Sequence, residues 1–144
     1  MADELSIADM MIRHHYNVEN IITEFNEKQK NDGKSVFEVF QRMKWELEKH
    51  FFLEENAIFI FYDPKSKEDS RIVNHILVEH ETMLKKLNEI EKKLKNNETV
   101  DISKFTKRLI QHKELEDNVF YPMLDNQLDE KQKLQITEKI KKLS

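Results

Sequence analysis

The chain has 144 residues, a net charge of −4 and no cysteine. Disulfides, thiolate zinc sites and cysteine nucleophiles are therefore excluded, and the acidic balance gives no reason to expect a nucleic-acid partner. No apolar run approaches the roughly 20 residues that span a bilayer, and the first residues lack a basic segment followed by an apolar stretch. We therefore expect a cytoplasmic protein without a membrane partner. One glycine, two prolines and 36% charged residues are typical of a helical protein.

Breakers and caps divide the chain into four long helices and a short C-terminal helix. The first three helices end at Asn31-Asp32-Gly33, Asp63-Pro64 and Asn96-Asn97. Asp101 can cap the start of the fourth helix, and Asp129 that of the C-terminal helix. The fourth helix runs to about Leu124 and tolerates or kinks at Pro122. Because the connections are short, neighbouring helices should be antiparallel. We expect an all-α, antiparallel up-down four-helix bundle over about residues 5–125 and a C-terminal helix over about 129–143, together forming a single domain.

Apolar residues recur at three- and four-residue steps in every long helix, which marks one buried face. Each of these stripes includes one histidine, and the four are His15, His50, His80 and His112. The second and fourth stripes also include Glu54 and Glu116, and the fourth continues through Val119 and Met123. Since burying an ionised carboxylate costs several kcal/mol unless it is paired, the two glutamates should have partners in the core.

The second and fourth helices carry the same motif. His50-Phe-Phe-Leu-Glu54-Glu55-Asn56 is echoed by His112-Lys-Glu-Leu-Glu116-Asp117-Asn118. A histidine and a glutamate four residues apart share one face of a helix, so each motif offers two ligand types that metals bind. The repeat predicts a metal site between the two halves of the bundle.

The distances from the turns indicate that these side chains meet. In antiparallel hairpins, equal residue counts from a turn give equal heights, and such counts place the four histidines at about one level. The second and fourth helices run in the same direction, so Glu54 and Glu116 rise on the same side, about one turn above the histidines.

Two further His-x-x-x-Glu strings, His15/Glu19 and His75/Glu79, lack this register. Glu19, His75 and Glu79 fall outside the apolar stripes, and we expect them at the solvated surface, where such a pair contributes a few tenths of a kcal/mol. A hydrogen-bonded polar layer that fixes the register of the bundle without metal is an alternative explanation of the buried residues.

His14 is an alternative ligand from the first helix, because it also fits an apolar lattice. The apolar residues around His15, however, occupy the same relative positions as those around His80 in the third helix. His15 is therefore the preferred ligand. Trp45 lies off the core stripe and should pack at a flank or an interface.

These residues resemble the hemerythrin-like family of His-His-Glu cation-binding domains, over roughly residues 5 to 125. The resemblance rests on His15, His50 with Glu54-Glu55, Glu79-His80, and His112 with Glu116 and Tyr121-Pro122. It implies an up-down bundle that holds two iron ions joined by an oxo or hydroxo bridge, with manganese or zinc as alternative metals. The implied terminal ligands are His15, His50, His80 and His112, and the implied bridging ligands are Glu54 and Glu116.

The sequence departs from the oxygen-carrying members of that family. Ile76 stands where they have a second histidine in the third helix, and Glu116 follows His112 by four residues where they have an aspartate five residues on. The resemblance therefore implies a protein that binds or reacts with O2 or NO, or that senses or handles iron. The alternatives are a di-iron enzyme (oxidase, peroxidase, NO reductase or iron–sulfur repair protein) and an interaction module with structural zinc. No residue is assigned as catalytic, and bulky Phe, Leu and Met side chains should exclude water and large substrates.

Overall fold

The computed structural model describes residues 6–31 and 36–143, and within these residues it contains helices and no strand. The predicted stop at Asp32-Gly33 lies outside them. The α-helices are α1 (Ile7–Asn31), α2 (Val36–Leu53), α3 (Lys67–Lys95), α4 (Ser103–Leu115), α5 (Tyr121–Gln127) and α6 (Glu130–Leu143). Two π-helical segments, η1 (Glu54–Ile58) and η3 (Glu116–Phe120), continue α2 and α4, and a 3₁₀ turn, η2 (Phe59–Phe61), follows η1.

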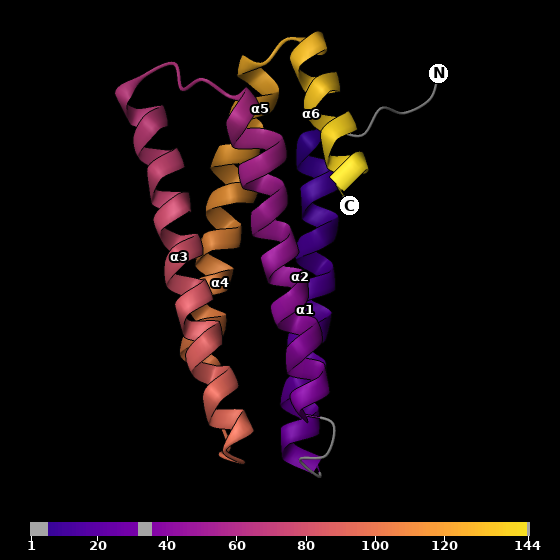
Figure 1. The fold of residues 1–144 in the computed structure, drawn as a ribbon. Helices are drawn as coiled ribbons and strands as arrows, with labels where there is room; N and C mark the ends of the chain where they lie inside the picture. The colour runs from indigo at the N-terminus through magenta and orange to yellow at the C-terminus, as the bar shows by residue number, and fades with distance from the viewer. Residues whose placement is uncertain (1–5, 32–35, 144) are drawn as a thin grey trace.

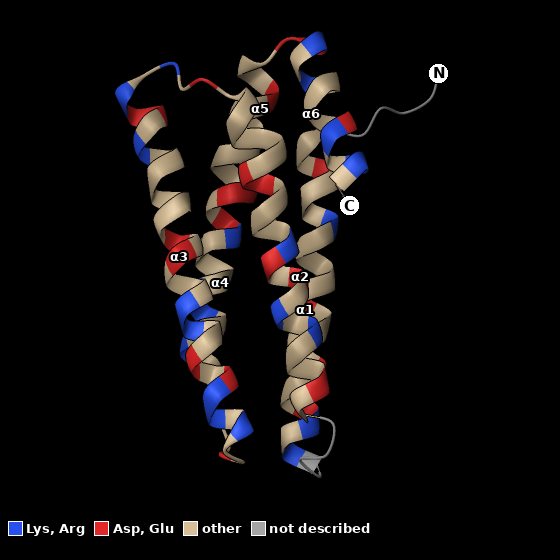
Figure 2. Ribbon diagram, viewed as in Figure 1, with Lys and Arg blue, Asp and Glu red and all other residues tan. Residues whose placement is uncertain are grey.

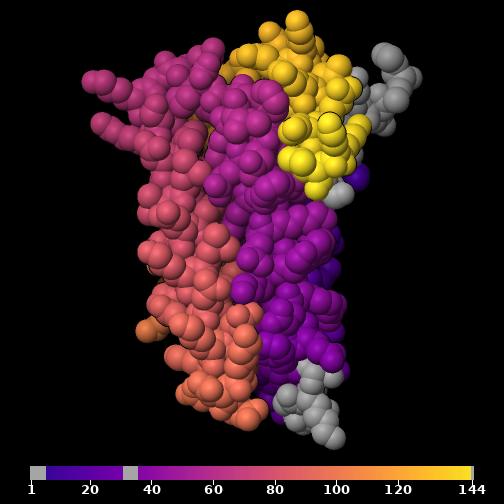
Figure 3. Space-filling view, in the orientation of Figure 1, coloured from indigo at the N-terminus to yellow at the C-terminus, as the bar shows by residue number. Residues whose placement is uncertain are grey.

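The long helices alternate in direction, and this arrangement confirms the predicted up-down bundle (Figure 1). α1 packs on α2, α2 on α3 and α3 on α4, while α4 continues through η3 into α5. The C-terminal helix α6 turns back and packs on α1 and η1, and it covers the upper part of the bundle beside α2 (Figure 3). Its buried contacts come from Ile136 and Ile140, and both signs of charge remain along its length (Figure 2).

The predicted caps form at the helix ends. The Asp129 carboxylate accepts the Gln132 N–H at 2.7 Å, and the Gln132 side chain accepts the Asp129 N–H at 3.0 Å, which is a reciprocal cap. Asp101 accepts the Ser103 N–H at 2.9 Å where α4 begins. After α3, Asn97 has φ of 60°, in the left-handed region that asparagine tolerates well.

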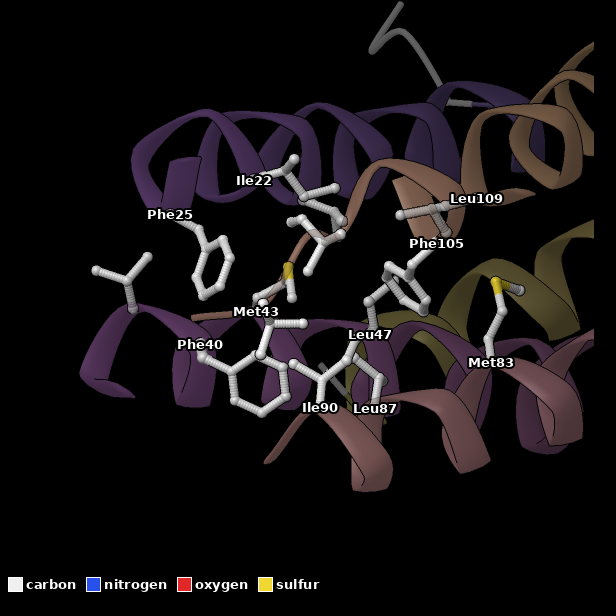
Figure 4. Packing of buried hydrophobic residues seen from close by; sticks show 14 of the residues in the cluster. Ile22, Phe25, Phe40, Met43, Leu47, Met83, Leu87, Ile90, Phe105 and Leu109 are labelled. Atoms are coloured by element: carbon white, nitrogen blue, oxygen red, sulfur yellow. The ribbon is translucent and has the colours of Figure 1, made fainter. Parts of the chain in front are cut away.

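Two apolar clusters fill the bundle, one on each side of the histidines. The lower cluster packs Phe25 of α1, Phe40 and Met43 of α2, and Leu87 and Ile90 of α3 among others, and Figure 4 shows these side chains meeting in the middle of the bundle. The upper cluster is built from the first residues of α1, from η1, α5 and α6. The predicted core faces are confirmed on every helix up to the motif glutamates.

The prediction for the fourth helix is wrong after Glu116. Val119 was expected in the core but is 43% exposed, whereas Phe120, Tyr121 and Leu124 are buried. The cause is η3: a π turn bonds residue i to i+5 instead of i+4, and so turns the following residues to new directions. Trp45 is exposed, as expected for a residue off the core stripe.

Candidate metal centre

Four histidines and two glutamates meet in the middle of the bundle, and all six are buried. They come from the four long helices and the π-helical segments that continue two of them: His15 from α1, His50 and Glu54 from α2 and η1, His80 from α3, and His112 and Glu116 from α4 and η3. Their ligand atoms form two overlapping groups, each with all its atoms within 4.8 Å of one another. One group is His15, His50 and Glu116, and the other is Glu54, His80, His112 and Glu116.

The carboxylate of Glu54 lies between two histidines from different helices. Its Oε1 atom is 2.8 Å from His50 Nε2 and 3.4 Å from His80 Nε2. One histidine belongs to each of the two groups, so this carboxylate is positioned between them.

Glu116, at the start of η3, repeats this arrangement. Its Oε1 atom is 3.1 Å from His15 Nε2, and its Oε2 atom is 3.2 Å from His112 Nε2. Both carboxylates therefore connect the pair His15 and His50 with the pair His80 and His112. The arrangement is close to two-fold symmetric, with α1 matching α3 and α2 matching α4.

Each of these glutamates is the first residue of a π-helical segment. The sequence did not reveal these segments, although the motif repeat marks both places where they begin. Isolated π turns within α-helices are rare and are frequent at functional sites. Here the wider turn begins where a buried carboxylate must point into the bundle.

Several ligand-type atoms in the cluster have no hydrogen-bond partner among the described residues. They include both carboxylate oxygens of Glu54, Oε2 of Glu116, and Nε2 of His80 and of His112. Burying such atoms unpaired costs free energy, and native structures rarely leave them so. Short contacts that lack hydrogen-bond geometry, such as that between His50 and Glu54, are the arrangement expected of atoms that share a cation. The residues present therefore fit a metal centre better than a polar layer without metal.

Without a cation, the carboxylates change the protonation of the histidines. Burial alone would lower the pKa of His50, but the charges of Glu54 and Glu116 outweigh it and raise the pKa to about 10. The pKa values of His15 and His80 are likewise raised by their carboxylate neighbours against the effect of burial. Burial would raise the pKa of Glu116, but contacts with the surrounding groups hold it well below its usual range. In the metal-free chain, protons on these histidines thus supply the positive charge that balances the two carboxylates.

Two further acids, which the sequence interpretation did not assign, contact the outer nitrogens of the histidines. Glu55 Oε2 is hydrogen-bonded to His80 Nδ1 at 2.9 Å, and Asp117 Oδ1 lies 3.0 Å from His15 Nδ1 without hydrogen-bond alignment. Both acids directly follow the motif glutamates, so the repeated acidic position was the available signal. A carboxylate on Nδ1 keeps a proton there and leaves Nε2 free as a ligand atom.

The structure separates the core histidines from the alternatives. His14 is half-buried, with its ring 5.9 Å from that of His50, and it belongs to neither ligand group. Burial next to His50 lowers its pKa to about 4. His75 is exposed, as expected, and Glu19 is partly exposed and pairs with Lys113.

Glu79 corrects one expectation. It was predicted at the solvated surface, but only 8% of the residue is exposed. Its carboxylate is 3.0 Å from Arg108 Nε of α4 and 3.2 Å from His75 Nε2. The apolar periodicity of one helix could not show that a neighbouring helix supplies a positively charged side chain, here Arg108.

Aromatic rings enclose parts of the centre. Phe51 stacks on His80, with ring centroids 4.2 Å apart. Tyr121 is fully buried, with its ring 6.0 Å from that of His15. Burial and the nearby negative charge of Glu116 raise the pKa of Tyr121, which therefore stays protonated.

A buried set of four histidines and two shared carboxylates in an up-down bundle defines a class of protein, the helical-bundle metal-binding domains. The model of the hemerythrin HHE cation-binding domain family matches residues 6–124, so the chain belongs to that family. Family and cluster together indicate a metal-binding domain. Comparisons with curated proteins and with solved structures give no match. None of the helices within the described residues is long and apolar enough to cross a membrane.

Proposed function

We propose that this chain is a non-haem di-iron protein that binds or reacts with a small molecule, O2 or NO, or that senses or handles iron. The observation that carries the proposal is the position of the two carboxylates. Each lies between a histidine of one pair and a histidine of the other. Two metal ions sharing two carboxylates need this arrangement, whereas a single ion does not.

His15 and His50 would hold one ion, and His80 and His112 the other, with Glu54 and Glu116 shared between them. Imidazole nitrogens combined with carboxylate oxygens suit iron, with manganese and zinc as the other candidates. Iron, when bound, would supply a redox-active centre able to bind a diatomic gas.

The chain itself contributes position, proton control and shielding. Glu55 keeps a proton on His80 Nδ1 and so holds the opposite ring nitrogen toward the centre. The raised pKa of Tyr121 keeps its hydroxyl neutral beside Glu116. The six ligand side chains are buried, and Phe51 and the residues of both apolar clusters pack around them.

We further propose that the bundle and α6 act as a single domain, because α6 buries Ile136 and Ile140 and packs on α1 and η1. The cytoplasmic location stays a prediction from the sequence.

Metal analysis of the chain purified without oxygen tests the proposal, combined with absorption spectra before and after addition of O2 and of NO. We expect two irons per chain and new near-ultraviolet bands on oxidation. The variant Glu116→Ala, which removes a shared carboxylate, should lose most of the iron and the bands. An iron content well below one per chain after anaerobic reconstitution would contradict the proposal. A colourless, zinc-loaded protein without any gas-dependent spectrum would instead support the interaction module with structural zinc.

A further inference from the structure

A cavity of about 190 Å³ lies beside the candidate metal centre, between α1, α2 and α4. His15, His50 and His112 line its inner end, and the apolar side chains around it include Val18, Ile22, Leu47, Phe51 and Leu109. Figure 4 labels Ile22, Leu47 and Leu109, which come from three different helices. Bulky Phe, Leu and Met side chains were expected to exclude water and large substrates, and on this side they leave an apolar cavity beside the histidines.

The cavity lies on the side of the histidines away from the two carboxylates. Glu54 and Glu116 follow their histidines along α2 and α4, whereas Leu47 and Leu109, which line the cavity, precede them. Neither carboxylate lines the cavity. A molecule in the cavity would thus meet the histidines on the face that the carboxylates leave free.

The cavity occurs where the near two-fold symmetry of the bundle fails. Phe51 directly follows His50 and covers His80, with ring centroids 4.2 Å apart. The matching residue after His112 is Lys113, and it extends to Glu19 instead of covering His15. One half of the bundle therefore has an aromatic ring where the other half has open space.

The residues three positions after His80 and His15 also differ in size between the two halves of the bundle. Met83 lies three residues after His80 and is fully buried, whereas the smaller Val18 holds the matching position after His15. Met83 does not line the cavity, and Val18 does. The smaller side chain and the missing ring together account for a cavity on one side of the centre.

Besides the three histidines, a few other polar groups line the cavity. The Glu19 and Lys113 ion pair joins α1 and α4 at the partly exposed side of the cavity, beside the exposed Ile110. Thr106 lines the cavity, and its Oγ1 atom is buried without a hydrogen-bond partner among the described residues. A buried hydroxyl of this kind costs free energy unless a ligand or a water pairs with it.

We propose that this cavity binds a small, largely apolar organic molecule that carries one hydrogen-bonding group. Apolar cavities of about 150 Å³ bind benzene, so a volume of about 190 Å³ suits a single ring with one short substituent. The ring would contact Val18, Ile22 and Leu109, and the polar group would pair with the Thr106 hydroxyl after a change of rotamer turns that hydroxyl toward the cavity. That the molecule would lie against bound metal rests on the proposed function, whereas binding in the cavity does not.

Benzyl alcohol is a suitable probe, and toluene is its match without the hydroxyl. Binding of both is measured by calorimetry and by NMR of the Val, Ile and Leu methyl groups, on the full chain loaded with zinc and on the metal-free chain. We expect saturable one-to-one binding of benzyl alcohol, with shifts confined to methyl groups that line the cavity, and weaker binding of toluene. Thr106→Val should abolish the difference between the two probes.

Two variants fill the cavity in independent ways. Val18→Met introduces the side chain found at the matching position in α3, and Lys113→Phe introduces the ring that Phe51 supplies in the other half. Each should weaken benzyl alcohol binding at least about tenfold, the amount that 1.4 kcal/mol of lost contacts produces. Val78→Met makes the first exchange at an exposed position of α3 and should bind like the unmodified chain.

Binding that does not saturate, or binding that both filled variants retain, would overturn the proposal. A third outcome would also overturn it: the unmodified chain does not bind benzyl alcohol, and Val18→Met loses O2 reactivity. The cavity would then be a route for gas alone. Benzyl alcohol binding to a chain that takes up no iron would support the cavity proposal while contradicting the di-iron function. The two proposals can therefore fail separately.

Discussion

Glu55 Oε2 lies 2.9 Å from Nδ1 of His80, so the acid next to one motif glutamate binds a histidine from the neighbouring helix. Asp117, at the matching position of the other motif, lies 3.0 Å from Nδ1 of His15 without hydrogen-bond alignment. The repeated motif thus contributes more than its own histidine and glutamate. Each copy also supplies an acid that contacts a histidine of the adjacent helix.

Removing Glu55 should weaken metal binding without unfolding the bundle. Loss of a partner that orients a ligand histidine typically costs about 10- to 100-fold in metal affinity, and we expect Glu55→Ala to fall in that range. Glu55→Gln keeps an acceptor oxygen and should lose less. Competition with a chelator measures the affinity, and Glu48→Ala, at an exposed position of α2, is the control. Equal affinities for Glu55→Ala and Glu48→Ala would contradict an orienting role.

Substitution of Glu54 or Glu116 should affect metal binding, whereas substitutions in the other His-x-x-x-Glu strings should not. Glu54→Ala and Glu116→Ala remove oxygen atoms that contact both histidine pairs, so each variant should lose most of its metal. Glu19→Ala and His75→Ala alter strings of the same spacing outside the cluster and should keep metal. Metal content per chain after identical reconstitution decides the matter. If His75→Ala loses iron as His80→Ala does, the ligand assigned to α3 is wrong.

The stability of the metal-free chain should fall as pH rises from about 7 to 10. The pKa of His50 is about 10 in the fold, against an ordinary value of 6.5. A raised histidine pKa stabilises the folded state fully below 6.5, and this contribution is lost as pH rises through 10. Urea unfolding at a series of pH values measures the effect. His50→Gln should show a smaller decline across the same window, and an equal or steeper decline in the variant would count against His50 as the source.

Metal binding should show the opposite dependence on pH. A cation has to displace the proton that His50 holds, so metal affinity should increase between pH 6.5 and 10. Competition titrations at fixed chelator strength follow this directly. An affinity that is constant over this range would mean that His50 is neutral before metal binds.

A hydrogen-bonded link above the centre should contribute to stability but not to metal content. Tyr62 donates its hydroxyl proton to Gln127 Oε1 at 2.8 Å, and the Gln127 amide donates to Asp69 at 2.9 Å. Gln127→Ala breaks both bonds and removes an acceptor of the part-buried Tyr62 hydroxyl, which should lower the free energy of unfolding by about 0.5–1.5 kcal/mol. Gln135→Ala, at an exposed position of α6, should have little effect. Loss of metal in Gln127→Ala would show that the link also supports the centre.

The periodicity of apolar residues was sufficient to predict the bundle and to predict that the four histidines and two glutamates meet in its core. The choice of His15 over His14 followed from the apolar residues around each, and burial of His15 agrees with it. That these side chains act as ligands stays a prediction. Contacts between helices could not be predicted in this way: Arg108 of α4 forms an ion pair with Glu79 of α3, and no pattern within α3 reveals it.

The π segments and the cavity were missed for related reasons. A regular helical period of 3.6 residues placed Val119 in the core, because it cannot register a wider turn that begins at a buried glutamate. The cavity depends on the difference in volume between Val18 and Met83, and a pattern of apolar and polar residues treats these two alike. The first feature belongs to the backbone and the second to side-chain volume, and the order of apolar and polar residues shows neither.

The contact between His15 and Glu116 joins residues that are 101 positions apart in the chain. A shared cation there would fasten the first long helix to the last, in a chain that has no cysteine with which to make a covalent cross-link. Neither hairpin, α1 with α2 or α3 with α4, contains both carboxylates, so neither holds a complete ligand set alone. Metal binding and docking of the two hairpins would therefore be coupled, so that bound metal would stabilise the assembled bundle relative to separated hairpins.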